Sequence, residues 1–210
     1  MGVSFVLQWY PQYNQTSTQA EEILNAHLVK LGAKTVSTWR MDCEQFGAVP
    51  NLFAISGKSF QVIHTSENEQ LSFAVSDQMG VIVAERSFDT ILTKLTDCYQ
   101  PNMLTRIEGK GKKYEIGDFS VKCGSVFLGP SFKCLVVEVD YRPSSYTKDT
   151  LPLVYEFLTI VCSNIIPIPE NLNHVTTLNP NFYQLSDTII QYLRIFNDCR
   201  RVNPNLGGVG

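Results

Sequence analysis

Charged residues alternate with apolar ones in two segments of this chain, and such alternation places every second side chain on the same face of a β-strand. The charged residues are Arg40, Asp42 and Glu44 in the first segment and Lys122, Glu138 and Asp140 in the second. If the strands close into a barrel, one face of each strand lines the lumen. Carboxylates in a lumen can bind a metal ion, and cationic side chains beside them can bind phosphate. The spacing therefore allows an enzymatic hypothesis, a β-barrel tunnel phosphohydrolase with a charged lumen.

The remaining predicted strands give this lumen little support. Segments 71–75 and 81–84 carry no charge. The even positions of the first strand are Ser4, Val6, Gln8 and Tyr10. A solvated outer face accounts for Lys122, Glu138 and Asp140 without further assumptions, and we expect that arrangement. Convergence of these three side chains on one cavity, with charges from several other strands, would favour the enzyme. A solvated or partner-facing orientation would exclude the tunnel.

Other catalytic motifs in the chain are incomplete. Gly57-Lys58-Ser59 matches the end of a phosphate-binding loop, but the first glycine of that motif would fall at position 52, which is Leu. The sequence GKGKKY at 109–114 lacks the third glycine of a dinucleotide fingerprint, so we predict a solvated turn there. No serine lies in a G-x-S-x-G motif, and none of the three histidines has a neighbouring motif that makes it a base. None of these motifs therefore identifies a catalytic residue, and the charged lumen is the one enzymatic hypothesis left open.

The cysteine spacing indicates neither a metal site nor a disulfide framework. The six cysteines are widely spread and include no C-x-x-C pair that would bind zinc. Cys123 and Cys134 could meet across a hairpin, but the alternation points Cys123 inward and Cys134 outward. We therefore expect free thiols, no bound metal and no cofactor.

Charge and hydropathy constrain the partners of this protein. The 17 basic and 20 acidic residues give a net charge of -3, so no global basic field attracts nucleic acid or anionic lipid. No apolar run approaches the roughly 20 residues of a membrane span. The first residues lack the positive region of a secretory signal. We expect a soluble intracellular protein with no direct contact to nucleic acid or membrane.

The hydrophobic pattern predicts more strands than helices. Alternating or short continuous apolar runs predict strands at 3–9, 35–44, 60–65, 71–75, 81–84, 104–108 and 113–116, then a hairpin within 120–141. Apolar stripes predict helices at 18–31, 87–99, about 150–161 and 186–201. Thr18 and Glu21 have the spacing of a capping box at the start of the first helix.

Most predicted strands follow one another without an intervening helix, which favours an antiparallel sheet over a doubly wound one. We predict an α+β fold, an antiparallel β-barrel-like sheet with three to four helices packed on one surface. The prediction is a single domain over 1–201 with a flexible C-terminal tail at 202–210.

Several segments resemble one known family. They are DFSVKCGSVFLGPSFKCLVVEVDY at 118–141, EFL at 156–158 and DTIIQYLRIFNDCRR at 187–201, with DCE at 42–44 and SFDTILTKL at 87–95. In these segments the chain resembles subunit 20 of the Mediator complex, a coactivator of RNA polymerase II. The resemblance is collinear over nearly the whole chain and weakens at 47–58 and 164–182.

The resemblance implies a non-catalytic role in the regulation of transcription in the nucleus. It implies a direct heterodimer with Mediator subunit 18 in the head module. It also implies an indirect contact with subunit 8, which subunit 18 mediates. The RNA polymerase II machinery and the TATA-binding protein are further partners that it implies for the assembly.

A heterodimer would also account for apolar residues in unusual places. Val126 and Val136 lie on the otherwise polar face of the hairpin, and the helix over 151–161 is apolar on nearly every side. A stable interface covers surface of this kind. The interface candidates are Val126, Val136, Glu138, Asp140 and Tyr155. A self-contained module that binds a peptide at a sheet edge is a further alternative.

Overall fold

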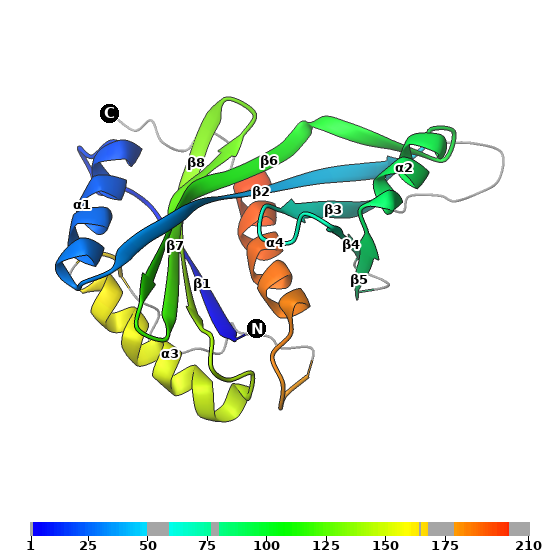
Figure 1. Cartoon of the computed structure of the whole chain (residues 1–210). Coiled ribbons are helices and arrows are strands. Elements are labelled where there is room, and N and C mark those ends of the chain that lie inside the picture. Colours follow the sequence, from blue (N-terminus) through cyan, green and yellow to red (C-terminus); the bar gives the residue numbers. More distant parts are fainter. Residues whose placement is uncertain (1, 50–58, 77–79, 164, 168–178, 202–210) are drawn as a thin grey trace.

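One curled antiparallel sheet forms the framework of the protein. The computed structural model describes residues 2–49, 59–76, 80–163, 165–167 and 179–201. Within these ranges, eight strands pair in the order β1-β8-β7-β6-β2-β3-β4-β5. They are β1 (Val3–Trp9), β2 (Lys34–Ala48), β3 (Ser59–Thr65), β4 (Leu71–Ser76), β5 (Gly80–Glu85), β6 (Tyr99–Ile116), β7 (Phe119–Leu128) and β8 (Ser131–Tyr141). The sheet curls into a half-barrel (Figure 1), which confirms the predicted fold class.

Helices cover both faces of the sheet. They are α1 (Ser17–Lys30), α2 (Ser87–Lys94), α3 (Thr147–Cys162) and α4 (Leu185–Arg201). We call the face against α4 the inner face, because the sheet curls around this helix (Figure 1). On the outer face, α1 and α3 cover the half formed by β1, β8 and β7, and α2 packs near β3.

The prediction that the helices pack on one surface is therefore wrong. The hairpin β7–β8 shows the reason, since it is apolar on both faces. Val121 and Val139 belong to the core under α1 and α3, whereas Val126 and Val136 belong to the core under α4. A sheet with two apolar faces needs cover on both of them.

Helix α1 begins one residue earlier than the sequence pattern indicated, and its cap differs. Thr16 has an extended backbone, with φ of −78° and ψ of 159°, and its side chain accepts a hydrogen bond from the Gln19 amide. The Gln19 side chain accepts in return from the Thr16 amide, at 3.0 Å. The capping box is thus Thr16 with Gln19 rather than Thr18 with Glu21.

Strand β6 is continuous where two strands and a solvated turn at GKGKKY were predicted. Gly111 of β6 lies directly opposite Gly124 of β7. A Cβ atom on Gly111 would lie 1.9 Å from the Cys123 carbonyl oxygen, so β6 and β7 approach here more closely than any side chain allows. These glycines therefore permit close strand packing.

Helix α2 is shorter than predicted. The predicted helix over 87–99 ends at Lys94, because Tyr99 and Pro101 belong to β6.

The hairpin β7–β8 turns at Gly129, whose φ of +56° favours glycine. Its register places Cys123 opposite Val137 and Cys134 opposite Val126, so the two thiols lie on different faces. All six cysteines are free. Cys134 is nevertheless buried, because α4 covers the face that was predicted to be outward. The Sγ atom of Cys134 lies 3.5 Å from Sγ of Cys199 on α4.

Some predictions fall outside the described residues. These are the residues Gly57 and Lys58 of the incomplete phosphate motif and the tail at 202–210. Among the helices of the described ranges, none is long and apolar enough to cross a membrane.

Candidate functional site

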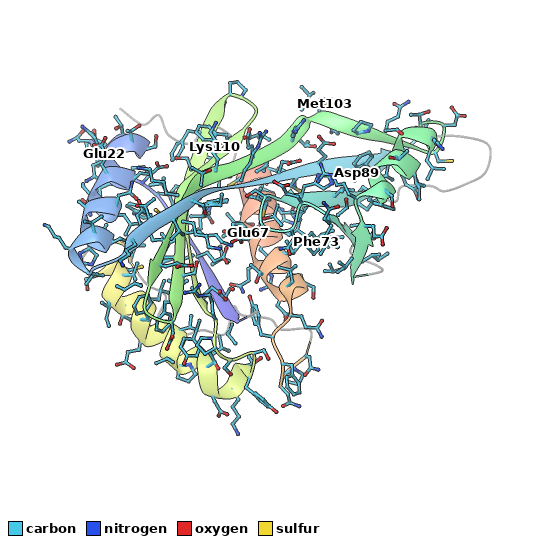
Figure 2. The ribbon with its side chains drawn as sticks, in the orientation of Figure 1. Glu22, Glu67, Phe73, Asp89, Met103 and Lys110 are labelled. Atoms are coloured by element: carbon cyan, nitrogen blue, oxygen red, sulfur yellow. The ribbon has the colours of Figure 1, made fainter. Side chains whose placement is uncertain are left out.

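The charged residues of the hairpin form a buried network under α4. Lys122 and Glu138 are direct cross-strand partners, and Nζ of Lys122 donates to both carboxylate oxygens of Glu138, each at 2.9 Å. The Tyr192 hydroxyl on α4 donates to Oε2 of Glu138 at 2.7 Å. Glu67, labelled in Figure 2, lies in the turn between β3 and β4. Its carboxylate accepts from Lys122 and from Lys113. Lys122 is 8% exposed and Glu138 is 2% exposed, so the prediction of a solvated face is wrong.

Mutual neutralisation explains how these charges are tolerated in the core. Burial by itself lowers the pKa of Lys122, but the carboxylates of Glu138 and Glu67 outweigh it and hold that pKa above its usual value. Burial likewise raises the pKa of Tyr192 well above its usual value, so its hydroxyl remains a donor to Glu138. The network therefore attaches α4 to the sheet through charge-assisted hydrogen bonds.

Helix α4 also covers the free edge of β1. The Gln191 side chain accepts from the Val6 amide at 2.8 Å and donates to the Ser4 carbonyl oxygen at 3.0 Å. It donates a second bond, to the Tyr183 hydroxyl, at 2.7 Å. A buried edge strand without such partners would leave peptide groups unsatisfied. Gln191 thus closes one edge of the half-barrel.

Asp140 lies two residues after Glu138 on β8, on the same face of the strand, and lines a pocket of about 270 Å³. Ser4, Asp140 and Ser120 are direct cross-strand neighbours on β1, β8 and β7. The Ser4 hydroxyl donates to Oδ1 of Asp140 at 3.0 Å. Ser120 is 2% exposed, and its hydroxyl has no hydrogen-bond partner among the described residues. Burial, and then the charge of Glu138, raise the pKa of Asp140.

The charged residues of the first segment, Arg40, Asp42 and Glu44, lie on the opposite face of the sheet. Trp39, Met41 and Cys43 of β2 pack against α4, so Arg40, Asp42 and Glu44 point to the outer face. There the three residues are paired locally. Their partners are Glu108 at 2.9 Å from Arg40, His64 at 3.4 Å from Asp42, and Arg106 at 3.0 Å from Glu44. The alternative hypothesis, in which all six charges line one lumen, is therefore wrong.

Lys122, Glu138 and Asp140 do line one cavity, and Glu67 and Lys113 line it as well. A tunnel enzyme would need such convergence together with charges from several other strands, so this requirement is met in part. Lys122 is already paired with two carboxylates, however, and α4 fills the inner face with Tyr192 and Phe196. No group of three or more metal-binding side chains occurs within the described ranges. The convergent charges therefore act on one another and on α4.

A histidine joins β3 to α2 on the outer face, and sequence reasoning had assigned it no role. His64 is half-buried, with Nδ1 3.4 Å from Asp42 and Nε2 3.1 Å from Asp89 of α2. Asp89 also accepts from Ser72 at 3.0 Å. Burial lowers the pKa of His64, but its two carboxylate partners outweigh burial and raise that pKa above 6.5.

We expect His64→Gln to reduce the free energy of unfolding by roughly 1 kcal/mol more at about pH 6 than at about pH 8.5. The folded pKa is raised, so the protonated imidazole stabilises the fold fully below the unfolded pKa near 6.5. This contribution is lost as the pH rises through the folded pKa. Urea unfolding at both pH values measures the difference. His27→Gln is the control, because that imidazole contacts the carbonyl oxygen of Ile160. Equal losses for His64→Gln at both pH values would contradict the prediction.

The five interface candidates lie in different environments. Val126 and Val136 are 0% and 1% exposed, and α4 of the same chain supplies the cover that a partner was expected to supply. Glu138 belongs to the buried network. Asp140 and Tyr155 are half-buried and keep accessible surface.

An exposed apolar groove lies at the other end of the sheet, where β5 is the last strand. It has a volume of about 280 Å³ and lies between this edge and α2. We call it the distal groove; its lining includes Phe60, Ile82, Phe88, Leu92, Leu95 and Tyr99. Ile82 is 45% exposed and Leu95 is 38% exposed. The sequence signal for this surface is the run of apolar residues over 81–84, which does not alternate with polar ones.

The family model and the curated relatives agree on one family. A model of the family described as the TATA-binding related factor (TRF) of subunit 20 of Mediator complex matches residues 1–197. The chain is 35% identical to Mediator of RNA polymerase II transcription subunit 20 of Aedes aegypti, over 96% of this chain and 95% of that protein. It is 30% identical to the Homo sapiens protein of the same name, over the same shares.

Among solved structures, the Mediator head module of Schizosaccharomyces pombe contains a similar chain. The TM-score is 0.41 and the identity is 11%, over 77% of this chain and 92% of that one. The family match and the curated relatives together establish that the chain belongs to the Mediator subunit 20 family.

Proposed function

We propose that the chain acts in the nucleus as a non-catalytic subunit of the Mediator coactivator. In this proposal it forms a heterodimer with Mediator subunit 18 in the head module and reaches subunit 8 through subunit 18. The RNA polymerase II machinery and the TATA-binding protein are partners of the assembly as a whole. The observation that carries the proposal is the family match over residues 1–197.

The internal use of the charged residues supports a non-catalytic role. A phosphoryl-transfer site needs cationic groups that are free to bind phosphate. In this chain, the buried ammonium of Lys122 is held by Glu138 and Glu67, and apolar residues of α4 pack against the inner face beside it. The same observations explain how this chain can carry charges in a barrel-like sheet without a catalytic role.

We place the heterodimer contact at the distal groove and the edge of β5. An exposed edge strand presents backbone groups that pair readily with another chain, and an apolar groove beside it provides hydrophobic contact area. Ile82 lies at this edge and lines the groove, together with Leu92 of α2 and Leu95, which directly follows that helix. Asp140 and Tyr155 stay candidates for contacts with further subunits.

Co-expression of the tagged full chain with Mediator subunit 18 tests the heterodimer. We expect the two chains to elute together in equal amounts. Elution of the tagged chain alone, as a stable monomer, would contradict the proposal.

We expect Ile82→Asp to weaken the heterodimer at least about tenfold, since a charge would be buried at the contact. Ile82 is 45% exposed in the isolated chain, so the fold should tolerate the change. Val29→Asp on α1 is the matched control, because Val29 is 59% exposed and lies away from the groove. Titration of purified subunit 18 measures the affinities, and unchanged binding by Ile82→Asp would exclude this surface.

A further inference from the structure

The pocket beside Asp140 has an unbalanced charge. Three carboxylates line it, from Glu67, Glu138 and Asp140, and two ammonium groups, from Lys113 and Lys122. Lys122 pairs with Glu138 and Glu67, and Lys113 pairs with Glu67. In the part of the chain that the structure describes, no cationic nitrogen lies within ion-pair distance of Asp140. One negative charge at the pocket is therefore without a direct counterion.

The same pocket has an unmatched hydrogen-bonding group. Ser120 is 2% exposed, lines the pocket and has a hydroxyl with no partner among the described residues. The neighbouring Asp140 receives one bond, from the Ser4 hydroxyl. A buried unsatisfied hydroxyl costs about 1–3 kcal/mol and normally has a partner. What the pocket lacks is a cation with several hydrogen-bond donors.

A guanidinium group fits these requirements better than a metal ion. It carries one positive charge and five donors in a planar arrangement, enough for the Asp140 carboxylate and the Ser120 hydroxyl together. A divalent cation would need the oxygens of Glu67 and Glu138, which the ammonium of Lys122 occupies. Leu185 and Ile189 of α4 form an apolar wall of the pocket, suited to the methylene stem of an arginine.

We propose that this pocket receives an arginine side chain from a partner protein of the assembly. The inference rests on the proposed function, because an assembly subunit has partners that can supply the side chain. In this proposal, Asp140 forms an ion pair with the guanidinium group of the arginine, and the Ser120 hydroxyl accepts a hydrogen bond from the same group. The pocket is separate from the distal groove, so the two contacts can be tested independently.

The test is a titration of the full chain with N-acetylarginine amide, followed by NMR of the backbone amides and the Ile189 methyl groups. We expect saturable shifts at Ser4, Ser120 and Ile189. Asp140→Asn should weaken binding at least about tenfold, since it removes the charge and keeps the shape. Asp118→Asn, at an exposed position, is the matched control and should bind like the unmodified chain. Ser120→Ala should weaken binding by a smaller factor.

Three outcomes would overturn the proposal. The first is the absence of saturable shifts, and the second is equal binding by Asp140→Asn and the unmodified chain. The third is undiminished probe binding after the chain has been reconstituted with its Mediator partners, because an arginine from a partner would then be absent from the pocket. A failed heterodimer with subunit 18 leaves the titration of the isolated chain unaffected, so the two proposals fail separately.

Discussion

Replacing Lys122 with Met is expected to reduce the free energy of unfolding by about 3–5 kcal/mol. The change leaves Glu138, which is 2% exposed, without its cationic partner and with the Tyr192 hydroxyl as a neutral donor. A buried charge without a partner costs far more than a surface ion pair contributes. Since the free energy of unfolding of a whole domain is roughly 5–15 kcal/mol, this single change should remove a large fraction of the stability of the fold.

Arg142→Met is the matched control for this experiment. Arg142 forms an ion pair with Glu115 at 2.7 Å, but the two side chains are 44% and 40% exposed. Its loss should cost less than about 1 kcal/mol. The double variant Lys122→Met with Glu138→Leu should recover part of the lost stability, because it removes the two buried charges but leaves the Tyr192 hydroxyl without its acceptor. Urea unfolding measures all three variants, and a double variant no more stable than Lys122→Met would contradict the explanation.

Replacing Gly111 or Gly124 with Ala is expected to destabilise the fold by at least about 3 kcal/mol or to prevent soluble expression. A Cβ atom on Gly111 would lie 1.9 Å from the Cys123 carbonyl oxygen, and one on Gly124 would lie 2.1 Å from the Lys110 carbonyl oxygen. Both obstacles are backbone atoms, so the strands β6 and β7 would have to separate.

Gly47→Ala provides the control for the glycine variants. Gly47 also lies in a strand, β2, but a Cβ atom there would meet nothing within 4 Å. Its replacement should change the free energy of unfolding by less than about 0.5 kcal/mol. Thermal unfolding compares the variants. If Gly111→Ala were as stable as Gly47→Ala, the close approach of β6 and β7 would not exist in solution.

Local patterns in the sequence predicted the hairpin well. The alternation on both sides of Gly129 is a property of neighbouring residues, and the strands β7 and β8 form where it indicated. Helix α4 was also predicted almost to the residue, because its apolar stripe is long and regular. The capping box of α1 was misplaced by two residues, since Thr16 and Thr18 offer the same side-chain chemistry.

The environment of Lys122 and Glu138 was predicted incorrectly, and the GKGKKY segment was assigned to a turn. Charged residues are usually solvated, so a pattern based on polarity places them outside. Their burial depends on Tyr192 and Glu67, which come from distant parts of the chain. The glycines of β6 likewise suggested a turn, because their actual role requires knowledge of the strand that lies against them.

The sequence by itself determined which side chains share a face of each strand, where most elements lie and, through its resemblance, which family the chain belongs to. Only the tertiary structure decided which faces are buried. Alternation is a local property, whereas burial of the inner face depends on α4, which follows the sheet in the chain and packs into its curve. Lys122 and Glu138 of the hairpin therefore belong neither to a solvated wall nor to a catalytic lumen; they form the polar attachment of α4 to the sheet.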